Sequence, residues 1–166
     1  MSVARVEAIF LVPAAGAAPQ AVEEAAAVAG RGLEGDRYFA GDGTYYADGK
    51  DGQDLTLIEA EAIEGLAREH GIELDPGECR RNVVTRGIGL NDLVGRRFRV
   101  GSVECEGRRL CDPCSYLEKL TEPGVLKGLV DRGGLRADIL RGGRIALGDE
   151  VLELGVQHDA GVAGLP

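Results

Sequence analysis

The stretch that decides the fold is GRRFRVGSVECE, residues 95–106. Residues 97–100 predict a strand, and Gly101 permits a turn. Residues 102–106 alternate apolar with polar or acidic side chains, which predicts a second strand with one buried face. The stretch GRIALG, residues 143–148, predicts a similar short strand that ends at glycine. Short strands joined at glycine turns are typical of a β-barrel.

The rest of the chain adds short strands and two helices. The helix is clearest over Glu59–His70, where apolar residues recur at helical spacing and Gly71 supplies a stop. A second, short helix is predicted over Glu122–Val130, and Asp75–Gly77 predicts a turn. The segment Pro19–Val28 is compatible with helix or strand by composition. Further strands are expected at residues 6–12, 54–58, 82–86, 135–140, 145–147 and 150–154.

Length and composition indicate one compact domain. The chain has 166 residues and 26 glycines, and it has no Trp. We expect a single domain over residues 1–154 and a loose tail over residues 155–166. No apolar run approaches the roughly 20 residues that span a bilayer. Glu7 interrupts the first apolar stretch, so no signal peptide is indicated, and we expect a cytoplasmic protein with reduced cysteines.

Charge is unevenly distributed along the chain. The net charge is −9, yet residues 79–144 carry 14 Lys and Arg against 8 Asp and Glu. Most of these basic residues are arginines, which suit bidentate binding of phosphate or carboxylate. The alternative is that they are solvated partners of the acidic residues. Few aromatic side chains are present for base stacking, so nucleic acid is not the expected partner.

The motif Cys111-Asp112-Pro113-Cys114 is the leading candidate for chemistry. Arg108 and Arg109 lie just upstream, and nearby cations favour the thiolate form of a cysteine. A thioredoxin-like role requires a parallel α/β context, which the chain lacks. A zinc site would require four ligands, for which Cys79 and Cys105 are the other sources. These two cysteines are expected instead to be small buried side chains.

Three further segments place glycine, arginine or amide groups at turns. They are residues 32–37 (GLEGDR), 80–82 (RRN) and 133–136 (GGLR). Glycine-rich turns can bring main-chain N–H groups close to an anion, although each segment could also be plain surface. The two histidines lie at a helix end and in the tail, which argues against a Cys–His pair.

Taken in order, these segments resemble the MOSC family, named for the C-terminal domain of molybdenum-cofactor sulfurases, and this chain resembles a short, stand-alone member. The matching pieces are residues 32–37, 55–59, 75–77, 81–85, 93–95, 98–101 and 111–114. The resemblance implies a mainly β fold with a few helices, closed as a β-barrel like that of pyruvate kinase. It also implies a functional cysteine, which here is Cys114.

The resemblance leaves three functions open. In the first, Cys114 ligates molybdenum in a molybdopterin cofactor, Gly35, Asp36, Arg37, Arg81, Asn82 and Arg136 bind that cofactor, and the protein reduces N-hydroxylated compounds. An electron-transfer protein is then the expected partner. In the second, Cys114 carries a persulfide from a cysteine desulfurase, a pyridoxal-phosphate enzyme. In the third, the domain binds the cofactor without turnover.

Overall fold

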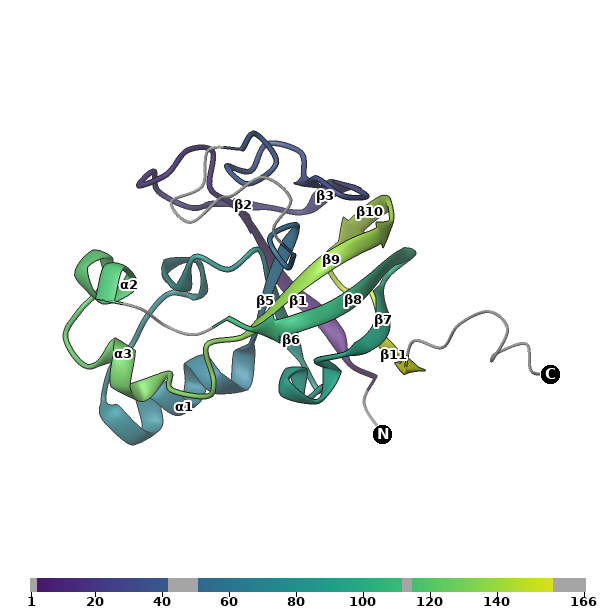
Figure 1. The fold of residues 1–166 in the computed structure, drawn as a ribbon. Helices are drawn as coiled ribbons and strands as arrows, with labels where there is room; N and C mark the ends of the chain where they lie inside the picture. Colours follow the sequence, from purple (N-terminus) through teal and green to yellow (C-terminus); the bar gives the residue numbers. More distant parts are fainter. Residues whose placement is uncertain (1–2, 42–50, 112–114, 157–166) are drawn as a thin grey trace.

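The computed structural model describes residues 3–41, 51–111 and 115–156, and strands dominate it (Figure 1). The elements in chain order are β1 (Arg5–Leu11), β2 (Gln20–Val22), β3 (Glu24–Val28), β4 (Gly32–Leu33), β5 (Leu55–Glu59), α1 (Ala60–His70), η1 (Pro76–Cys79), β6 (Val83–Arg86), η2 (Leu90–Leu93), β7 (Arg96–Val100), β8 (Val103–Leu110), α2 (Ser115–Leu120), α3 (Val125–Gly128), β9 (Leu135–Arg141), β10 (Gly143–Ala146) and β11 (Val151–Val156). The prediction of a mainly β chain with a few helices is confirmed.

Two sheets organise these strands. The larger has the order β11-β7-β8-β9-β5-β6-β1-β2, and the smaller has the order β10-β3-β4. Neighbouring strands are antiparallel, except for the parallel pair β5 and β6. The β8–β9 ladder is long and contains two register shifts. Because opposite residues of a ladder point to the same face, this register decides which side chains of β8 and β9 lie together.

The residues at the start of β11, one end of the large sheet, contact the start of β1. Arg5 forms an antiparallel bridge with Glu150. The N–H of Val6 donates to the main-chain oxygen of Asp149 at 2.9 Å, and the N–H of Val151 donates to that of Ala4 at 2.9 Å. The residues that lead into β11 therefore lie beside β1.

The main core lies on one face of the large sheet. Leu55 and Leu57 of β5 and Leu135 of β9 have no exposed surface, and they belong to one apolar cluster. Fully burying one such side chain contributes about 1.5–3 kcal/mol. Because side chains alternate along a strand, Thr56 and Arg136 project from the opposite face. That opposite face is where polar groups gather.

Helix α1 covers part of that opposite face. Its residue Ile63 packs in a buried cluster with Ile58 of β5 and Val84 of β6. The helix ends at Gly71, whose φ of 67° lets its N–H donate back to the main-chain oxygen of Ala67 at 3.0 Å. The helix predicted from the sequence is confirmed. No helix among the described residues is long and apolar enough to cross a membrane.

Several local expectations are adjusted by the structure. The ambiguous segment Pro19–Val28 forms β2 and β3, and the turn at residues 75–77 leads into η1. The second predicted helix is shorter, at Val125–Gly128. Helix α2 was not predicted, because its six residues are too few to show a periodic pattern. Strand β11 runs to Val156, two residues past the strand expected to end at residue 154.

Candidate functional site

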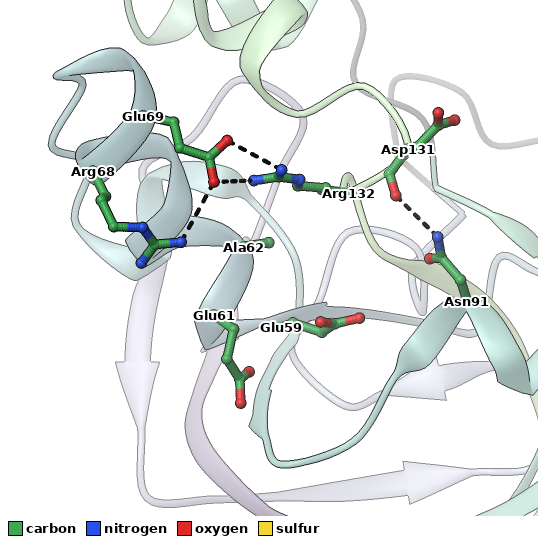
Figure 2. Close-up of a pocket in the computed structure, with 8 residues that line it drawn as sticks. All are labelled: Glu59, Glu61, Ala62, Arg68, Glu69, Asn91, Asp131 and Arg132. Carbon is green, nitrogen blue, oxygen red and sulfur yellow. Dashed lines mark hydrogen bonds and ion pairs between the residues drawn. The ribbon is translucent and has the colours of Figure 1, made fainter.

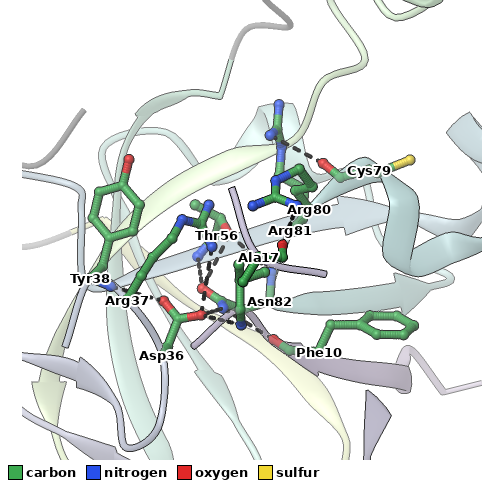
Figure 3. Close-up of polar contacts among 11 residues, drawn as sticks. Phe10, Ala17, Asp36, Arg37, Tyr38, Thr56, Cys79, Arg80, Arg81 and Asn82 are labelled. Atoms are coloured by element: carbon green, nitrogen blue, oxygen red, sulfur yellow. Dashed lines mark hydrogen bonds and ion pairs between the residues drawn. The ribbon is translucent and has the colours of Figure 1, made fainter. Parts of the chain in front are cut away.

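Asp36 is a buried carboxylate that organises the turn after β4. Its side chain is 3% exposed. Its Oδ1 accepts the N–H of Val12 at 2.9 Å, and its Oδ2 accepts the N–H of Tyr38 at 3.2 Å. The guanidinium of Arg37 lies 3.7 Å from Oδ1. Burying a carboxylate without hydrogen-bond donors is costly, and these contacts hold Asp36 beside Arg37 and Tyr38 (Figure 3).

Asn82, just before β6, connects that turn to the large sheet. Its Nδ2 donates to Oδ1 of Asp36 at 3.2 Å and to the main-chain oxygen of Phe10 at 3.2 Å. Its Oδ1 accepts the N–H and the hydroxyl of Thr56, each at 3.2 Å. The N–H of Asn82 donates to the Thr56 hydroxyl oxygen at 3.0 Å. The amide of Asn82 is therefore fully occupied with holding β1, β5 and residue 36 together.

A surface that we call the Tyr38 face lies on the outer side of β5, β9 and β8. It consists of Arg37, Tyr38, Arg109 and Arg136. The guanidinium carbon of Arg37 lies 4.9 Å from the centre of the Tyr38 ring, and that of Arg136 lies 6.0 Å from it. Tyr38 is 8% exposed. Both guanidinium groups lie within the range of a cation–π contact, so one ring supports two cations.

Arg136 and Arg109 are neighbours by strand register. Arg136 on β9 is opposite Thr56 on β5 and opposite Arg109 on β8. A Cβ placed on Gly52 would lie 2.8 Å from Nη1 of Arg109 and 3.3 Å from Cβ of Arg136. The two arginines therefore both border the space at Gly52, where the positive φ of 76° and these close contacts favour a residue without a side chain.

The carboxylates near this face already have partners. Arg108 contacts Asp51 at 2.6 Å, Glu106 at 3.4 Å and Asp138 at 3.5 Å. Asp138 also accepts the N–H of Gly52 at 2.7 Å. Arg108, which lies just upstream of the cysteine motif in the sequence, therefore forms ion pairs with this carboxylate cluster.

The guanidinium groups of Arg109 and Arg136 are left with donors to spare. Arg109 donates to the main-chain oxygen of Asp51 at 2.5 Å. Within the described part of the chain, neither arginine forms an ion pair, and Arg136 forms no side-chain hydrogen bond. Both residues are half-buried. A partly buried guanidinium with unused N–H groups can take a phosphate or carboxylate without breaking an existing ion pair.

Arg81 has a different environment from Arg136. Its Nε donates to the main-chain oxygen of Gly133 at 2.8 Å. Its Nη1 and Nη2 donate to the main-chain oxygens of Cys79 and Cys111, each at 3.3 Å. The residue is 9% exposed. We call this arrangement, comprising Arg81 and its three acceptor residues Cys79, Cys111 and Gly133, the Arg81 clamp (the Cys79 contact is visible in Figure 3).

The cysteines divide into buried ones and one that the structure does not describe. Cys79 and Cys105 have no exposed surface, and Cys111 is 1% exposed. Burial raises the pKa of the Cys79 thiol to about 11 and raises the pKa of Cys105 as well. The prediction that Cys79 and Cys105 are buried side chains is confirmed. The predicted working residue, Cys114, lies outside the described residues, with Cys111 the last described position before it.

A separate cavity of about 340 Å³ lies where β5 passes into α1 (Figure 2). Glu69 at its edge contacts Arg68 at 3.4 Å and Arg132 at 3.1 Å. Glu59 accepts the N–H of Leu90 at 3.0 Å, and burial raises its pKa. No predicted site residue lines this cavity. The described residues contain no group of three or more His, Cys, Asp or Glu placed to hold a metal ion.

The structure brings together part of the predicted site. Asp36, Arg37 and Asn82 form one contact network, and Arg136 joins it through Tyr38. Gly35 supplies the turn into that network with a φ of 92°. Arg81 contacts a different set of groups, although it is adjacent to Asn82 in the chain. Tyr38 and Thr56 were missed as site residues, because an uncharged ring and a strand hydroxyl were not considered as supports of an anion-binding site.

Comparison with known proteins gives one family and several related folds. The family model described as the MOSC domain matches residues 44–152. The chain is similar to the YuaD protein from Bacillus subtilis, with a TM-score of 0.74 and 17% identity over 94% of this chain and 98% of that one. It is also similar to YiiM from Geobacillus stearothermophilus, with a TM-score of 0.69 and 15% identity over 91% of this chain and 75% of the other. A third similar structure is YiiM from Escherichia coli, with a TM-score of 0.66 and 19% identity over 93% of this chain and 72% of the other.

These structural likenesses concern the fold, because the identities are low. No protein in the curated comparison matches the chain.

Proposed function

The chain belongs to the MOSC domain family, and from that premise we propose that it binds a molybdenum cofactor through Cys114 and uses it to reduce N-hydroxylated compounds. The observation that carries the proposal is the Tyr38 face. There Arg109 and Arg136 have unused N–H donors, and Arg37 contacts the same Tyr38 ring as Arg136. Planar guanidinium groups match the geometry of a phosphate, and molybdopterin carries one.

The described residues fit the phosphorylated end of this cofactor. Arg136 and Arg109 would hold the phosphate. Arg37 would be a third cation, although it also forms an ion pair with Asp36. A cysteine thiolate is a soft ligand that suits molybdenum, and Cys114 would supply it. When bound, the metal supplies two-electron redox chemistry.

The other members of the network have supporting tasks. Asp36 and Asn82 use their polar atoms on main-chain groups and on each other, so their contribution is to fix Arg37 and Tyr38 in place. The ring of Tyr38 limits the orientations of two guanidinium groups at once. Binding an anion to donors that are already oriented avoids the entropy of ordering them.

The proposed reaction determines which electron donor and which substrate class the protein requires. Reducing an N–OH group to N–H consumes two electrons and two protons and releases water. An electron-transfer protein is therefore the proposed partner, and the substrate class is N-hydroxylated compounds.

We also infer that the contact between β1 and the start of β11 closes the large sheet as a barrel, which would hold β5, β8 and β9 rigid beneath the Tyr38 face.

The experiment is to measure molybdenum and pterin per chain in protein purified from cells that make the cofactor. Wild-type protein should carry both near stoichiometrically. Cys114→Ala should lower both by about tenfold or more, because a metal held by one protein thiolate loses its ligand. Cys111→Ser is the matched control, since its side chain is buried, and it should keep most of the metal. Loaded protein should then consume an N-hydroxylated amine when given a reductant.

Two outcomes would contradict the proposal. Metal-free wild-type protein with a sulfane sulfur on Cys114, seen by intact mass, would assign the residue to sulfur transfer from a cysteine desulfurase instead. Full metal loading that leaves N-hydroxylated compounds unreduced, with electrons supplied, would make the domain a binding module.

A further inference from the structure

Arg108 forms ion pairs with three carboxylates from three parts of the chain. Asp51 precedes β5, Glu106 shares β8 with Arg108, and Asp138 lies on β9. We call these three acidic residues the Arg108 carboxylates. The side chains of Glu106 and Asp138 are only 19% and 23% exposed, so water and salt screen their charges less than those of fully exposed carboxylates.

The same carboxylates lie close to the unpaired arginines of the Tyr38 face. The main-chain oxygen of Asp51 accepts an N–H of Arg109 at 2.5 Å. Asp138 follows Arg136 by two residues on β9, so the two side chains project to the same face of the sheet. Gly52 donates its N–H to Asp138 at 2.7 Å, and a Cβ on Gly52 would lie 2.8 Å from Nη1 of Arg109. Asp51 and Asp138 are therefore neighbours of both arginines.

A β-bulge places Arg108 beside Arg109. The pairing of β8 with β9 shifts between Gly107 and Arg109, so Arg108 is the extra residue of β8. Consecutive side chains of a regular strand point to opposite faces, whereas a bulge changes the direction of a side chain. Here both arginines contact Asp51, Arg108 at its carboxylate and Arg109 at its main-chain oxygen. The bulge therefore brings two consecutive arginines to one side of the sheet.

We propose that Arg108 is a positioning residue of the Tyr38 face, because it keeps the Arg108 carboxylates from pairing with Arg109 and Arg136. Within the described part of the chain, neither of those two arginines forms an ion pair. Without Arg108, the carboxylates would pair with the two arginines or repel an approaching anion, and either change weakens anion binding. The inference deepens the proposed function, on which it rests for the identity of the anion as a phosphate.

The test measures the affinity for inorganic phosphate of protein purified from cells that do not make the cofactor. Isothermal titration calorimetry at one pH and one ionic strength gives the dissociation constant. Wild-type protein should bind phosphate, and Arg108→Gln should bind it about fivefold more weakly or worse, because the carboxylates lose their shared cation. The side chain of Arg108 is 34% exposed, so the variant should stay folded, which circular dichroism checks.

Arg99→Gln is the matched control for the loss of one arginine. Its side chain is 35% exposed, and it pairs with a single carboxylate, that of Glu150 at 3.4 Å. The substitution also removes one positive charge and also leaves a carboxylate without its cation. Arg99→Gln should keep the phosphate affinity within about twofold of the wild type, because Glu150 is not one of the Arg108 carboxylates.

Two double variants separate pairing from net charge. Arg108→Gln/Asp138→Asn has the net charge of the wild type, and the Asn oxygen can still accept the N–H of Gly52. It should return the phosphate affinity to within about twofold of the wild type, because one competing carboxylate is gone. Arg108→Gln/Glu150→Gln has the same net charge but keeps all three Arg108 carboxylates. It should bind phosphate as weakly as Arg108→Gln. A purely structural loss would not be repaired by either second substitution.

The inference is overturned if wild-type protein does not bind phosphate at millimolar concentrations, if Arg108→Gln keeps the wild-type affinity, or if the two double variants bind equally. These outcomes depend neither on molybdenum nor on Cys114. A protein that never loads the cofactor but shows the Arg108 effect would refute the proposed function and leave the positioning role intact. A protein that loads the cofactor while Arg108→Gln binds phosphate normally would do the reverse.

Discussion

At the Arg81 clamp, a buried guanidinium donates to three main-chain oxygens, whereas at the Tyr38 face the guanidinium of Arg136 has no described hydrogen-bond acceptor. Both arginines come from the same basic part of the sequence. Removing the first leaves buried main-chain oxygens without donors, while removing the second leaves no known group unsatisfied. The difference separates an arginine that holds the fold from one that is available to a ligand.

The largest effect is expected at Gly134. Gly134→Ala would require a positive φ and would place Cβ 2.0 Å from the main-chain oxygen of Leu57, so it should cost about 4 kcal/mol or more in the free energy of unfolding. Gly35→Ala, in the turn that supports the Tyr38 face, also has a positive φ, but its Cβ would meet only a Leu11 methyl at 3.2 Å. It should cost about 1–2 kcal/mol. Urea denaturation measures the free energy of unfolding of both variants. Equal losses would contradict the expectation that the turn at Gly134 tolerates a side chain less well than the turn at Gly35.

A smaller effect is expected when the two arginines are replaced in parallel. Arg81→Gln should lower the free energy of unfolding by about 2–4 kcal/mol, because it removes donors from buried main-chain oxygens. Arg136→Gln should change it by no more than about 0.5 kcal/mol. Equilibrium denaturation of both variants at the same pH and salt measures the difference. Similar losses would mean that Arg136 has a structural task that the described contacts do not show.

Much of the fold could be predicted from local patterns. The α1 helix and the strands from β5 to β9 follow from apolar periodicity and glycine stops. Helix α2 could not, because its stability comes from packing Leu117 into a cluster with α1 and α3, which no local pattern reveals. The division of the strands into two sheets is likewise a property of long-range pairing.

The candidate site was predictable in its residue types and less so in their roles. Arginine content indicated anion binding, and the alternative that these arginines pair with acidic residues also holds for many of them. Arg96 contacts Glu153 at 2.7 Å, and Arg144 contacts Glu24 at 2.9 Å. Which arginines remain without a carboxylate depends on strand register. Arg109 and Arg136 are opposite each other only because of the bulge between Gly107 and Arg109.

The most direct test of the account is the pterin content of Arg136→Gln compared with Arg141→Gln. Both residues lie on β9 and both changes remove one positive charge, but Arg141 is 75% exposed and pairs with Glu104 at 3.6 Å. Protein purified from cofactor-producing cells is oxidised, and the fluorescent pterin is measured per chain. We expect Arg136→Gln to lower it by about fivefold or more, because a charge-assisted phosphate contact is lost, and Arg141→Gln to match the wild type. Equal pterin content in the two variants would contradict the claim that the Tyr38 face holds the cofactor.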